Sequence, residues 1–304
     1  MAILIDQPRW PAHGTHFAHL ASDSSLAELH AFARAVGLHC RAFDHDHYDV
    51  PEAKVPELVA AGAAPTPARE LAARLEAAGL RVRGAARAAH RTRVRPRLER
   101  AWLGLLPDHP ELGGRLLQRW SEPHRHYHDL RHLAHILDSL AILAEGPPPV
   151  EVALAAWFHD AVYAGVAGED ERASADLARA ELEAVGASSR LVSEVSRLVE
   201  LTIAHDPDPA DANGVALVDA DLSILGQPAG RYQMYVRDVR LEHTDLDEIA
   251  FAVARSRVVE ALLGAETLFR SDLAQRLWLG TARENLASEL AHWDSIRTGQ
   301  VHHW

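Results

Sequence analysis

Cysteine, lysine and long apolar runs are all scarce in this sequence, and each shortage excludes a class of protein. Cys40 is the single cysteine among 304 residues, so neither an intrachain disulfide nor a cysteine-built zinc site can form. Lys54 is the single lysine, which argues against Schiff-base chemistry. No run of about 18 apolar residues predicts a transmembrane helix, and the first residues lack the pattern of a signal peptide. We therefore expect a soluble cytoplasmic protein.

Positive charge is also in deficit, because 43 Asp and Glu residues face 31 Lys and Arg residues and the net charge is −12. Proteins that bind nucleic acid or membrane surfaces need net cation to neutralise phosphates. We therefore expect that the protein binds neither membranes nor long nucleic acids, although the end of an RNA is not excluded as a substrate. Histidine is abundant instead, with 20 residues. Imidazole is the commonest metal ligand and a base at physiological pH, which turns attention to metal chemistry.

The sequence pattern predicts an α+β protein in two parts joined by a linker. Residues 1–84 mix short strands at 2–6, 16–20 and 40–43 with helices, as in a small mixed α/β domain. Residues 85–100 are the predicted linker, since 81–100 hold eight arginines and no acid before Glu99. The alternative for this stretch is a helix that pairs with the acidic body. Residues 101–304 are predicted to be an all-helical domain, with helices at 112–120, 125–143, 150–163, 170–186, 188–204, 218–226, 229–241, 245–264 and 266–291.

Histidines and acids gather at three points of the helical part. The run EPHRHYHDLRHLAH spans Glu122–His135, and on a helix its residues 128, 132 and 135 share a face. His159 and Asp160 end an apolar helix, and Asp219 and Asp221 lie in apolar surroundings. Buried charges are costly unless they are paired or bound to metal. Imidazole and carboxylate together suit divalent Fe, Mn, Ni, Co or Zn, although either aspartate could instead cap a helix.

The order of these points resembles the HD superfamily of metal-dependent phosphohydrolases, over about residues 101–291. The closest resemblance is to a bacterial branch of predicted metal-dependent phosphohydrolases. The motifs that carry it are EPHRHYHDLRH, AAWFHDAVY, ERASAD, LVDADLSILG and ARENL. The resemblance implies an HD-type all-helical domain over 101–304 that binds a divalent metal ion: Mn, Fe, Co, Ni, Zn or Mg.

The resemblance also implies roles for particular residues. His132, His159, Asp160 and Asp221 match the metal ligands. His128 competes with His132, but Tyr127, His128 and His132 are similar to an arrangement in cyclic-nucleotide phosphodiesterases of the same superfamily. In those enzymes the first histidine donates a proton and the second binds metal, so His132 is assigned to metal and His128 to the acid or to phosphate. A supporting or surface histidine is the alternative for His128. Superfamily patterns favour Asp221 over Asp219, and Asp160 is expected to orient the attacking water.

Other residues around these motifs are further candidates. His205, at a helix end, is a candidate catalytic residue or substrate contact, with a polar loop residue as the alternative. Glu171 and the arginines at 240, 257 and 283 are candidates for substrate binding, because guanidinium matches phosphate geometry. Alternatively, Glu171 stabilises the start of a helix, and each arginine forms an ion pair on a helix surface. In HD proteins with two metals a His-Glu pair is often found where this sequence has Asp170-Glu171, and this departure from the resemblance favours one ion.

Residues 1–84 resemble a small family of unknown function from bacteria and phages. The resemblance rests on Ile5-Asp6, HLASD at 19–23, ELH at 28–30 and HYD at 47–49, and it implies no activity. Asp6, His19, His47 and Asp49 could form a polar cluster for a metal or a nucleotide. A structural or docking role is the alternative.

These observations predict a metal-dependent phosphohydrolase, either a phosphomonoesterase or a phosphodiesterase. The expected partner is a small phosphorylated substrate, a nucleotide first of all, and a homo-oligomer is compatible with the sequence. Two other functions stay open. One is a di-iron oxygenase of HD type, which requires additional histidine ligands, and the other is a non-catalytic nucleotide sensor.

Overall fold

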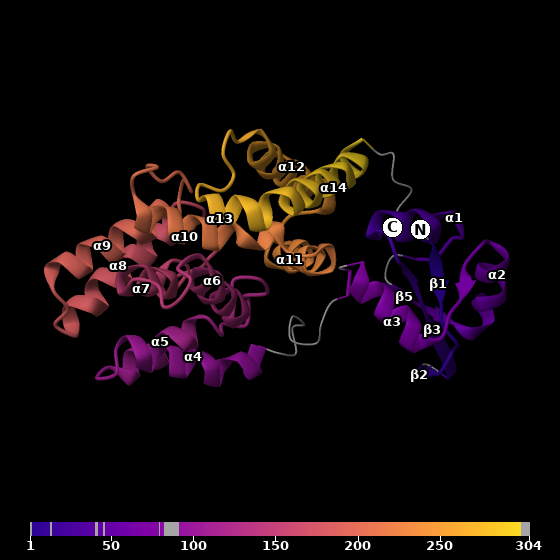
Figure 1. Cartoon of the computed structure of the whole chain (residues 1–304), viewed down its shortest axis with the longest axis horizontal. Helices are drawn as coiled ribbons and strands as arrows, with labels where there is room; N and C mark the ends of the chain where they lie inside the picture. Colours follow the sequence, from indigo (N-terminus) through magenta and orange to yellow (C-terminus); the bar gives the residue numbers. More distant parts are fainter. Residues whose placement is uncertain are drawn as a thin grey trace.

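A computed structural model of the chain describes residues 2–12, 14–39, 42–44, 46–78, 80–81 and 91–298. It contains a small sheet region at the N-terminal side and a remainder that is mostly helical (Figure 1). The fold class is therefore α+β, which confirms the prediction.

The N-terminal part is built on one sheet with the order β4-β5-β3-β1-β6, while β2 pairs with β3 beside this path. The central strand β3 runs antiparallel to β1, β2 and β5, and β1 pairs with β6 in parallel. Successive side chains of a strand point to opposite faces. Ala18 and Leu20 of β3 accordingly lie in the core, while His19 lies on the other face. The strands are β1 (Ile3–Ile5), β2 (Trp10–Ala12), β3 (Thr15–Ser22), β4 (Phe43–Asp44), β5 (His47–Pro51) and β6 (Ala64–Pro65).

Short helices pack on this sheet: α1 (Leu26–Ala35), a 3-10 turn (Glu52–Lys54), α2 (Val55–Ala60) and α3 (Ala68–Ala77). Helix α1 begins after Ser25, whose side chain caps the helix by accepting a hydrogen bond from the Glu28 amide at 3.1 Å. The strand predicted at 40–43 begins only at Phe43, and Cys40 lies outside the described residues. Strands β2, β5 and β6 were not predicted.

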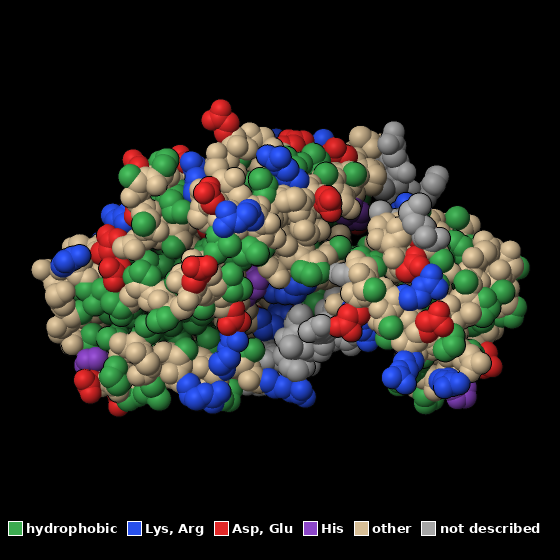
Figure 2. Space-filling view, in the orientation of Figure 1, with side chains coloured by type: hydrophobic (Ala, Val, Ile, Leu, Met, Phe, Trp, Pro, Cys, Tyr) green, Lys and Arg blue, Asp and Glu red, His purple; other side chains and the backbone are tan. Residues whose placement is uncertain are grey.

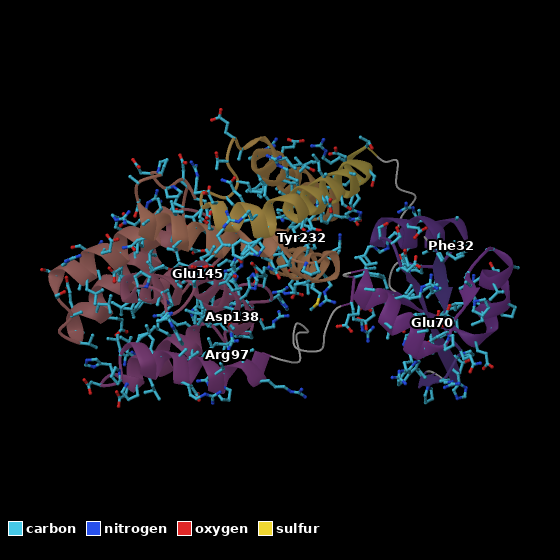
Figure 3. The ribbon with its side chains drawn as sticks, in the orientation of Figure 1. Phe32, Glu70, Arg97, Asp138, Glu145 and Tyr232 are labelled. Carbon is cyan, nitrogen blue, oxygen red and sulfur yellow. The ribbon has the colours of Figure 1, made fainter. Side chains whose placement is uncertain are left out.

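The arginine-rich stretch differs from the predicted linker, because residues from Arg91 onward form α4 (Arg91–Leu105). Leu98 and Trp102 of this helix are buried in the helical core. Arg97 donates to Asp138 on α6 at 2.9 Å, and Figure 3 shows the two side chains together. Basic side chains follow the edge of the molecule over α4 (Figure 2). The helix alternative thus describes 91–100, whereas the predicted linker residues 85–90 lie outside the described residues.

The helical part encloses two apolar cores. One core joins α4 to α10, and the other joins α11 to α14. The helices are α5 (Pro110–Arg119), α6 (Leu130–Leu143), α7 (Val150–Phe158), α8 (Glu169–Ala184), α9 (Ser189–Leu201), α10 (Ala212–Leu222), α11 (Ala229–Glu242), α12 (Glu248–Gly264), α13 (Asp272–Ala274) and α14 (Gly280–Arg297), with a 3-10 turn at Ser223–Gly226 and a π-helical turn at Gln275–Leu279.

Several helix boundaries differ from the prediction in ways that shape the site. Residues 125–129 form a turn before α6, because the Asp129 carboxylate caps the helix by accepting from the Arg131 amide at 2.7 Å. Helix α7 ends at Phe158 instead of 163, so His159 and Asp160 lie in the turn that follows. Helix α10 begins six residues before the predicted start at 218, and the predicted helix 266–291 is broken before α13.

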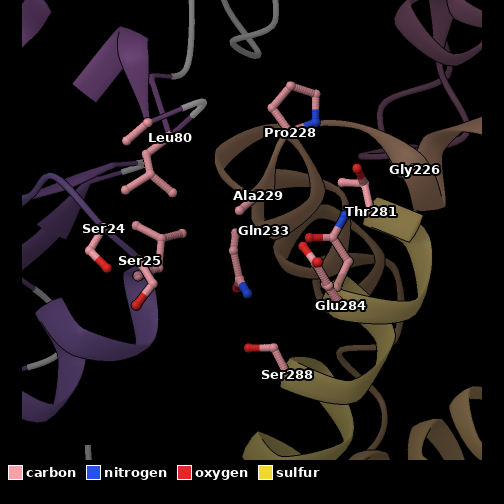
Figure 4. A pocket seen from close by; sticks show the side chains of 13 residues that line it. Ser24, Ser25, Leu80, Gly226, Pro228, Ala229, Gln233, Thr281, Glu284 and Ser288 are labelled. Atoms are coloured by element: carbon pink, nitrogen blue, oxygen red, sulfur yellow. The ribbon is translucent and has the colours of Figure 1, made fainter. Parts of the chain in front are cut away.

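A cavity of about 470 Å³ lies between the sheet region and the helical part (Figure 4). Ser25 and Leu80 line one side, and Pro228, Gln233 and Glu284 line the other. Its described lining residues include no histidine, so this cavity is separate from the histidine clusters below. Among the described helices, none is both long enough and apolar enough to cross a membrane.

Candidate metal centre

Three side chains from three separate segments of the chain meet in the interior of the helical part. His132 lies in the first turn of α6, His159 directly follows α7, and Asp221 is in the last turn of α10. One ligand atom of each lies within 4.8 Å of the others. The Nε2 atom of His132 is 3.3 Å from Asp221 Oδ1 and 3.3 Å from His159 Nε2. Buried imidazole and carboxylate groups are thus positioned to bind a metal ion.

The tautomer of His159 is fixed by the backbone of α7. Its Nδ1 lies 2.9 Å from the carbonyl oxygen of Ala156, which can only accept a hydrogen bond. Nδ1 therefore carries the proton, and in the neutral ring Nε2 presents a lone pair to the cluster. Such a backbone contact to the outer nitrogen is the usual support of a metal-binding histidine.

Asp160 completes the group, with Oδ2 at 3.0 Å from His159 Nε2 and 3.6 Å from His132 Nε2. Burial disfavours the imidazolium, but the nearby Asp160 and Asp221 together raise the pKa of His159 to about 9. Burial also opposes the charge of Asp160, yet His159 and His132 hold its pKa well below the usual range. The pKa of Asp221 is lowered in the same way by His132 and His205, against the effect of burial.

These contacts fit a cation in the middle of the group. Two carboxylates and the lone pair of His159 converge on one buried point, and their mutual repulsion is relieved only by a proton or a metal ion there. The aromatic rings of Tyr127 and Trp120 lie against His132, with ring centroids 4.6 and 6.1 Å away. They cover the ligands on that side, so the donor set and its surroundings suit a divalent transition metal.

Glu242 organises the segment beside this group, and sequence reasoning missed it. Its Oε1 atom accepts hydrogen bonds from the amides of residues 126, 127 and 128 at 2.7, 2.7 and 2.9 Å. Its Oε2 atom lies 2.7 Å from His128 Nδ1 and accepts from the Tyr163 hydroxyl at 3.0 Å. The His128 ring stacks on Tyr163 with 4.3 Å between centroids. One carboxylate therefore fixes both the backbone and the ring of His128.

Electrostatics follow from this contact. Burial works against the imidazolium of His128, but Glu242 outweighs it and raises the pKa of His128. Burial likewise opposes ionisation of Glu242, yet His128 and the backbone amides lower the pKa of Glu242 to about 2. The contact thus favours the ionised carboxylate of Glu242 paired with the protonated imidazole of His128.

Arg125 is a second residue that sequence reasoning missed. Its side chain is fully buried, and Nη1 donates to the carbonyl oxygens of Asp160 at 2.6 Å and His128 at 3.2 Å. Nη2 donates to Ala161 O at 3.2 Å. The guanidinium thus joins the turn that carries His159 and Asp160 to the segment that carries His128. In the sequence this arginine looks like any polar residue of a histidine-rich run.

The two aspartates left open by the sequence have different partners. The buried carboxylate of Asp219 accepts from the amides of Arg270 and Ser271 at 2.7 and 2.8 Å, so it holds the chain that enters α13. Asp221 faces the histidines instead, and its Oδ2 atom is 2.8 Å from His205 Nε2. His205 is one of two described non-glycine residues with positive φ, at 51°. It contacts the group through Asp221.

The remaining candidates lie in other contacts. Glu171 accepts from the Gly168 amide at 2.6 Å, and Asp170 accepts from three amides at residues 164–166, so both acids support the start of α8. Arg240 donates to the carbonyl oxygens of His243 and Leu246 at 2.6 and 3.0 Å. Two candidates are simply exposed on their helices: Arg257 on α12 and Arg283 on α14.

Comparison with known proteins gives one family match. Residues 3–78 match a family model described as a protein of unknown function (DUF4031). This is in line with the family of unknown function that residues 1–84 resemble. No curated protein and no solved structure matches the chain. The resemblance of residues 101–291 to the HD superfamily gains no support from these comparisons and stays a prediction.

Proposed function

We propose that the helical part is a metal-dependent phosphohydrolase that acts on a small phosphate ester. A nucleotide is the substrate class that we favour. The observation that carries the proposal is the convergence of His132, His159 and Asp221 beside a histidine whose proton is held by Glu242. A metal ion held next to a proton donor can supply both an activated water and a proton for the leaving oxygen of a phosphate ester.

In this proposal His132, His159, Asp160 and Asp221 hold one divalent ion. When bound, such an ion lowers the pKa of a coordinated water and withdraws charge from a phosphoryl oxygen. Of the two carboxylates that face His159, Asp160 lies closer to Nε2, with Oδ2 at 3.0 Å against 3.9 Å for Asp221 Oδ1. It accepts a hydrogen bond from the attacking water and orients it toward phosphorus.

His128 is the proton donor of the proposed reaction. The carboxylate of Glu242 accepts only, so Nδ1 of His128 keeps its proton and Nε2 is the nitrogen that donates to the leaving oxygen. Glu242 raises the pKa of His128 against the effect of burial, which favours the protonated ring that a proton donor needs. General acid catalysis of this kind contributes about 10²–10⁴-fold.

One ion is favoured over two. The acids at the positions where a second metal would need ligands, Asp170 and Glu171, accept hydrogen bonds from backbone amides. Among the described residues, the helical part offers one group of three ligand atoms within reach of a common ion. The di-iron oxygenase is therefore kept as an outcome of the test.

The test is a panel of phosphomonoesters and phosphodiesters assayed with Mn²⁺, Co²⁺, Ni²⁺ and Mg²⁺, together with metal quantification on the purified chain. We expect turnover of at least one ester with about one ion in the helical part. His159→Ala and Asp160→Asn should each abolish turnover, and His159→Ala should remove the ion.

Asp176→Asn on the exposed face of α8 is the matched control and should leave metal and turnover unchanged. Full activity of His159→Ala would overturn the assignment. Two irons per chain with oxygen consumption would replace the hydrolase with an oxygenase. Retained metal with no turnover over the whole panel would replace it with a sensor.

A further inference from the structure

A second histidine cluster lies on the sheet of the N-terminal part. His19 of β3 and Asp49 of β5 are directly paired across two antiparallel strands, and His47 lies two residues before Asp49 on the same strand. Alternate residues of a strand share a face, so all three side chains meet on the face opposite Ala18 and Leu20. One ligand atom of each lies within 4.8 Å of the others.

The first histidine is held by a buried carboxylate. Asp6 directly follows β1 and is 3% exposed. Its Oδ2 lies 2.9 Å from His19 Nδ1, and its Oδ1 accepts from the His19 amide at 2.6 Å. Because a carboxylate can only accept, Nδ1 carries the proton and Nε2 is left to face Asp49 Oδ1, at 3.9 Å.

The second histidine repeats this arrangement with different residues. Asp46 is fully buried, and its Oδ1 lies 2.7 Å from His47 Nδ1. The Nε2 atom of His47 again faces Asp49 Oδ1, at 3.5 Å. The two rings meet edge to face with 4.5 Å between centroids. Two imidazoles therefore each have a carboxylate behind Nδ1 and aim Nε2 at the same oxygen atom.

Buried carboxylates behind the outer nitrogen are the support that metal-binding histidines usually have. They fix the tautomer, orient the ring and make Nε2 more basic. In the neutral rings, both Nε2 lone pairs would face the Asp49 carboxylate, which is unfavourable without a cation between them. Protons can supply that cation, since Asp46 and Asp49 overcome the effect of burial and raise the pKa of His47 to about 9. A metal ion can supply it too.

We propose that His19, His47 and Asp49 form a site for a divalent transition metal, of which Zn²⁺ is the representative. Zinc bonds of about 2.0–2.2 Å place tetrahedral donors about 3.3–3.6 Å apart. The Nε2 atoms of His47 and His19 lie 3.5 and 3.9 Å from Asp49 Oδ1, close to that separation. Two imidazoles and one carboxylate select such an ion over Mg²⁺ or Ca²⁺. The Asp49 side chain is 44% exposed, so a fourth position is open to water or an exogenous ligand. The site lies inside the matched region 3–78 and is independent of the proposed phosphohydrolase.

The experiment measures Zn²⁺ binding to the full chain by equilibrium dialysis with metal quantification and by titration calorimetry. His159→Ala serves as the background that removes the helical ion. In that background we expect about one Zn²⁺ per chain. Asp49→Asn and His47→Gln should each weaken its binding tenfold or more. Asp6→Asn, which changes only the group behind His19, should weaken it about 10–100-fold.

His16→Gln is the matched control, because His16 lies on the same strand β3 with a side chain that is 55% exposed. It should leave the affinity unchanged. Far-UV circular dichroism of Asp49→Asn checks that the sheet is intact. Because the Asp49 side chain is 44% exposed, we expect this variant to fold, so that a loss of metal reports the loss of a ligand. Zn²⁺ affinity that is unaltered in Asp49→Asn and His47→Gln would overturn the proposal and leave His19 and His47 as hydrogen-bonded side chains without a metal. A chain that shows no phosphohydrolase turnover but still binds Zn²⁺ at His19, His47 and Asp49 would contradict the proposed function and support this metal site.

Discussion

The carboxylate of Glu242, at the end of α11, lies 2.7 Å from the imidazole Nδ1 of His128, across 114 residues of sequence. The same carboxylate accepts from three successive amides around that histidine. The position of His128 beside the buried ligand group therefore depends on a residue of a distant helix.

Replacing Glu242 by Gln should weaken the proton donor without removing the metal. The loss of the negative charge lowers the pKa of His128, so less of the ring is protonated at neutral pH. With an ester turned over in the panel, kcat should fall about tenfold to a hundredfold. The limb of the pH profile where activity falls with rising pH should move to lower pH. The control Glu248→Gln, on the exposed first turn of α12, should change neither kcat nor the pH profile. If the descending limb of the pH profile stays in place in Glu242→Gln, His128 is not the proton donor.

Two neighbouring aspartates should separate metal binding from stability. Asp221→Asn should lose the helical ion, while Asp219→Asn should keep it. Asp219→Asn should instead lower the free energy of unfolding by about 1–3 kcal/mol, because a buried, charged acceptor of two backbone amides is lost. Metal quantification and urea unfolding of chelator-treated protein provide both readouts. Metal loss in Asp219→Asn with retention in Asp221→Asn would reverse the assignment.

Two adjacent glycines of α5 should respond in opposite directions to alanine. A Cβ atom on Gly113 would overlap the buried Trp102 indole, while one on Gly114 would meet nothing within 4 Å. Gly113→Ala should therefore destabilise the chain by about 1–3 kcal/mol through overpacking. Gly114→Ala should stabilise it by about 0.5–1 kcal/mol through helix propensity. Denaturant unfolding of both variants measures these changes. Equal changes in the free energy of unfolding for the two variants would contradict the packing of α4 on α5 described above.

His135 should make the chain sensitive to acid. Burial, with a further contribution from Arg231, lowers the pKa of His135 to about 3, while its Nε2 lies 2.9 Å from Ser223 Oγ. The unfolded chain, with a histidine pKa of about 6.5, binds the proton more readily. The stability from this neutral ring is complete above pH 6.5 and is lost as pH falls toward 3. At pH 5 the loss is about 2 kcal/mol.

His135→Gln keeps a polar atom near Ser223 and removes the titration. Its free energy of unfolding should therefore decrease less between pH 7 and pH 5 than that of the unchanged chain. Urea unfolding at the two pH values gives the comparison. Equal decreases in both proteins would show that His135 is solvated or is paired when protonated.

The sequence predicted the fold class and most helices, because amphipathic periodicity and caps such as Ser25 are local signals. It also drew attention to His132, His159 and Asp221, since histidine and acid stand out in apolar segments. The helix predicted to reach 163 ends at Phe158 instead. Apolar periodicity continues past this point, and the turn is set by tertiary contacts such as those of Arg125 with Asp160 and Ala161.

The residues that sequence reasoning missed act over long distances or look ordinary. Glu242 is one acid of an acidic chain, and nothing local marks its contact with His128. The start of α4 is similar: its arginines suggest a solvated linker, whereas Leu98 and Trp102 on one face secure the helix to the core. Two buried apolar side chains are therefore enough to pack a strongly basic helix against the core.

The three ligands lie on α6, directly after α7 and on α10, so they join three helical segments of the chain. An ion bound by His132, His159 and Asp221 would act as a cross-link that must break before these helices can part. Its main effect would then be on the rate of unfolding. The metal-loaded chain would persist longer under a denaturant or a protease than its equilibrium stability alone requires, with ion release setting its lifetime.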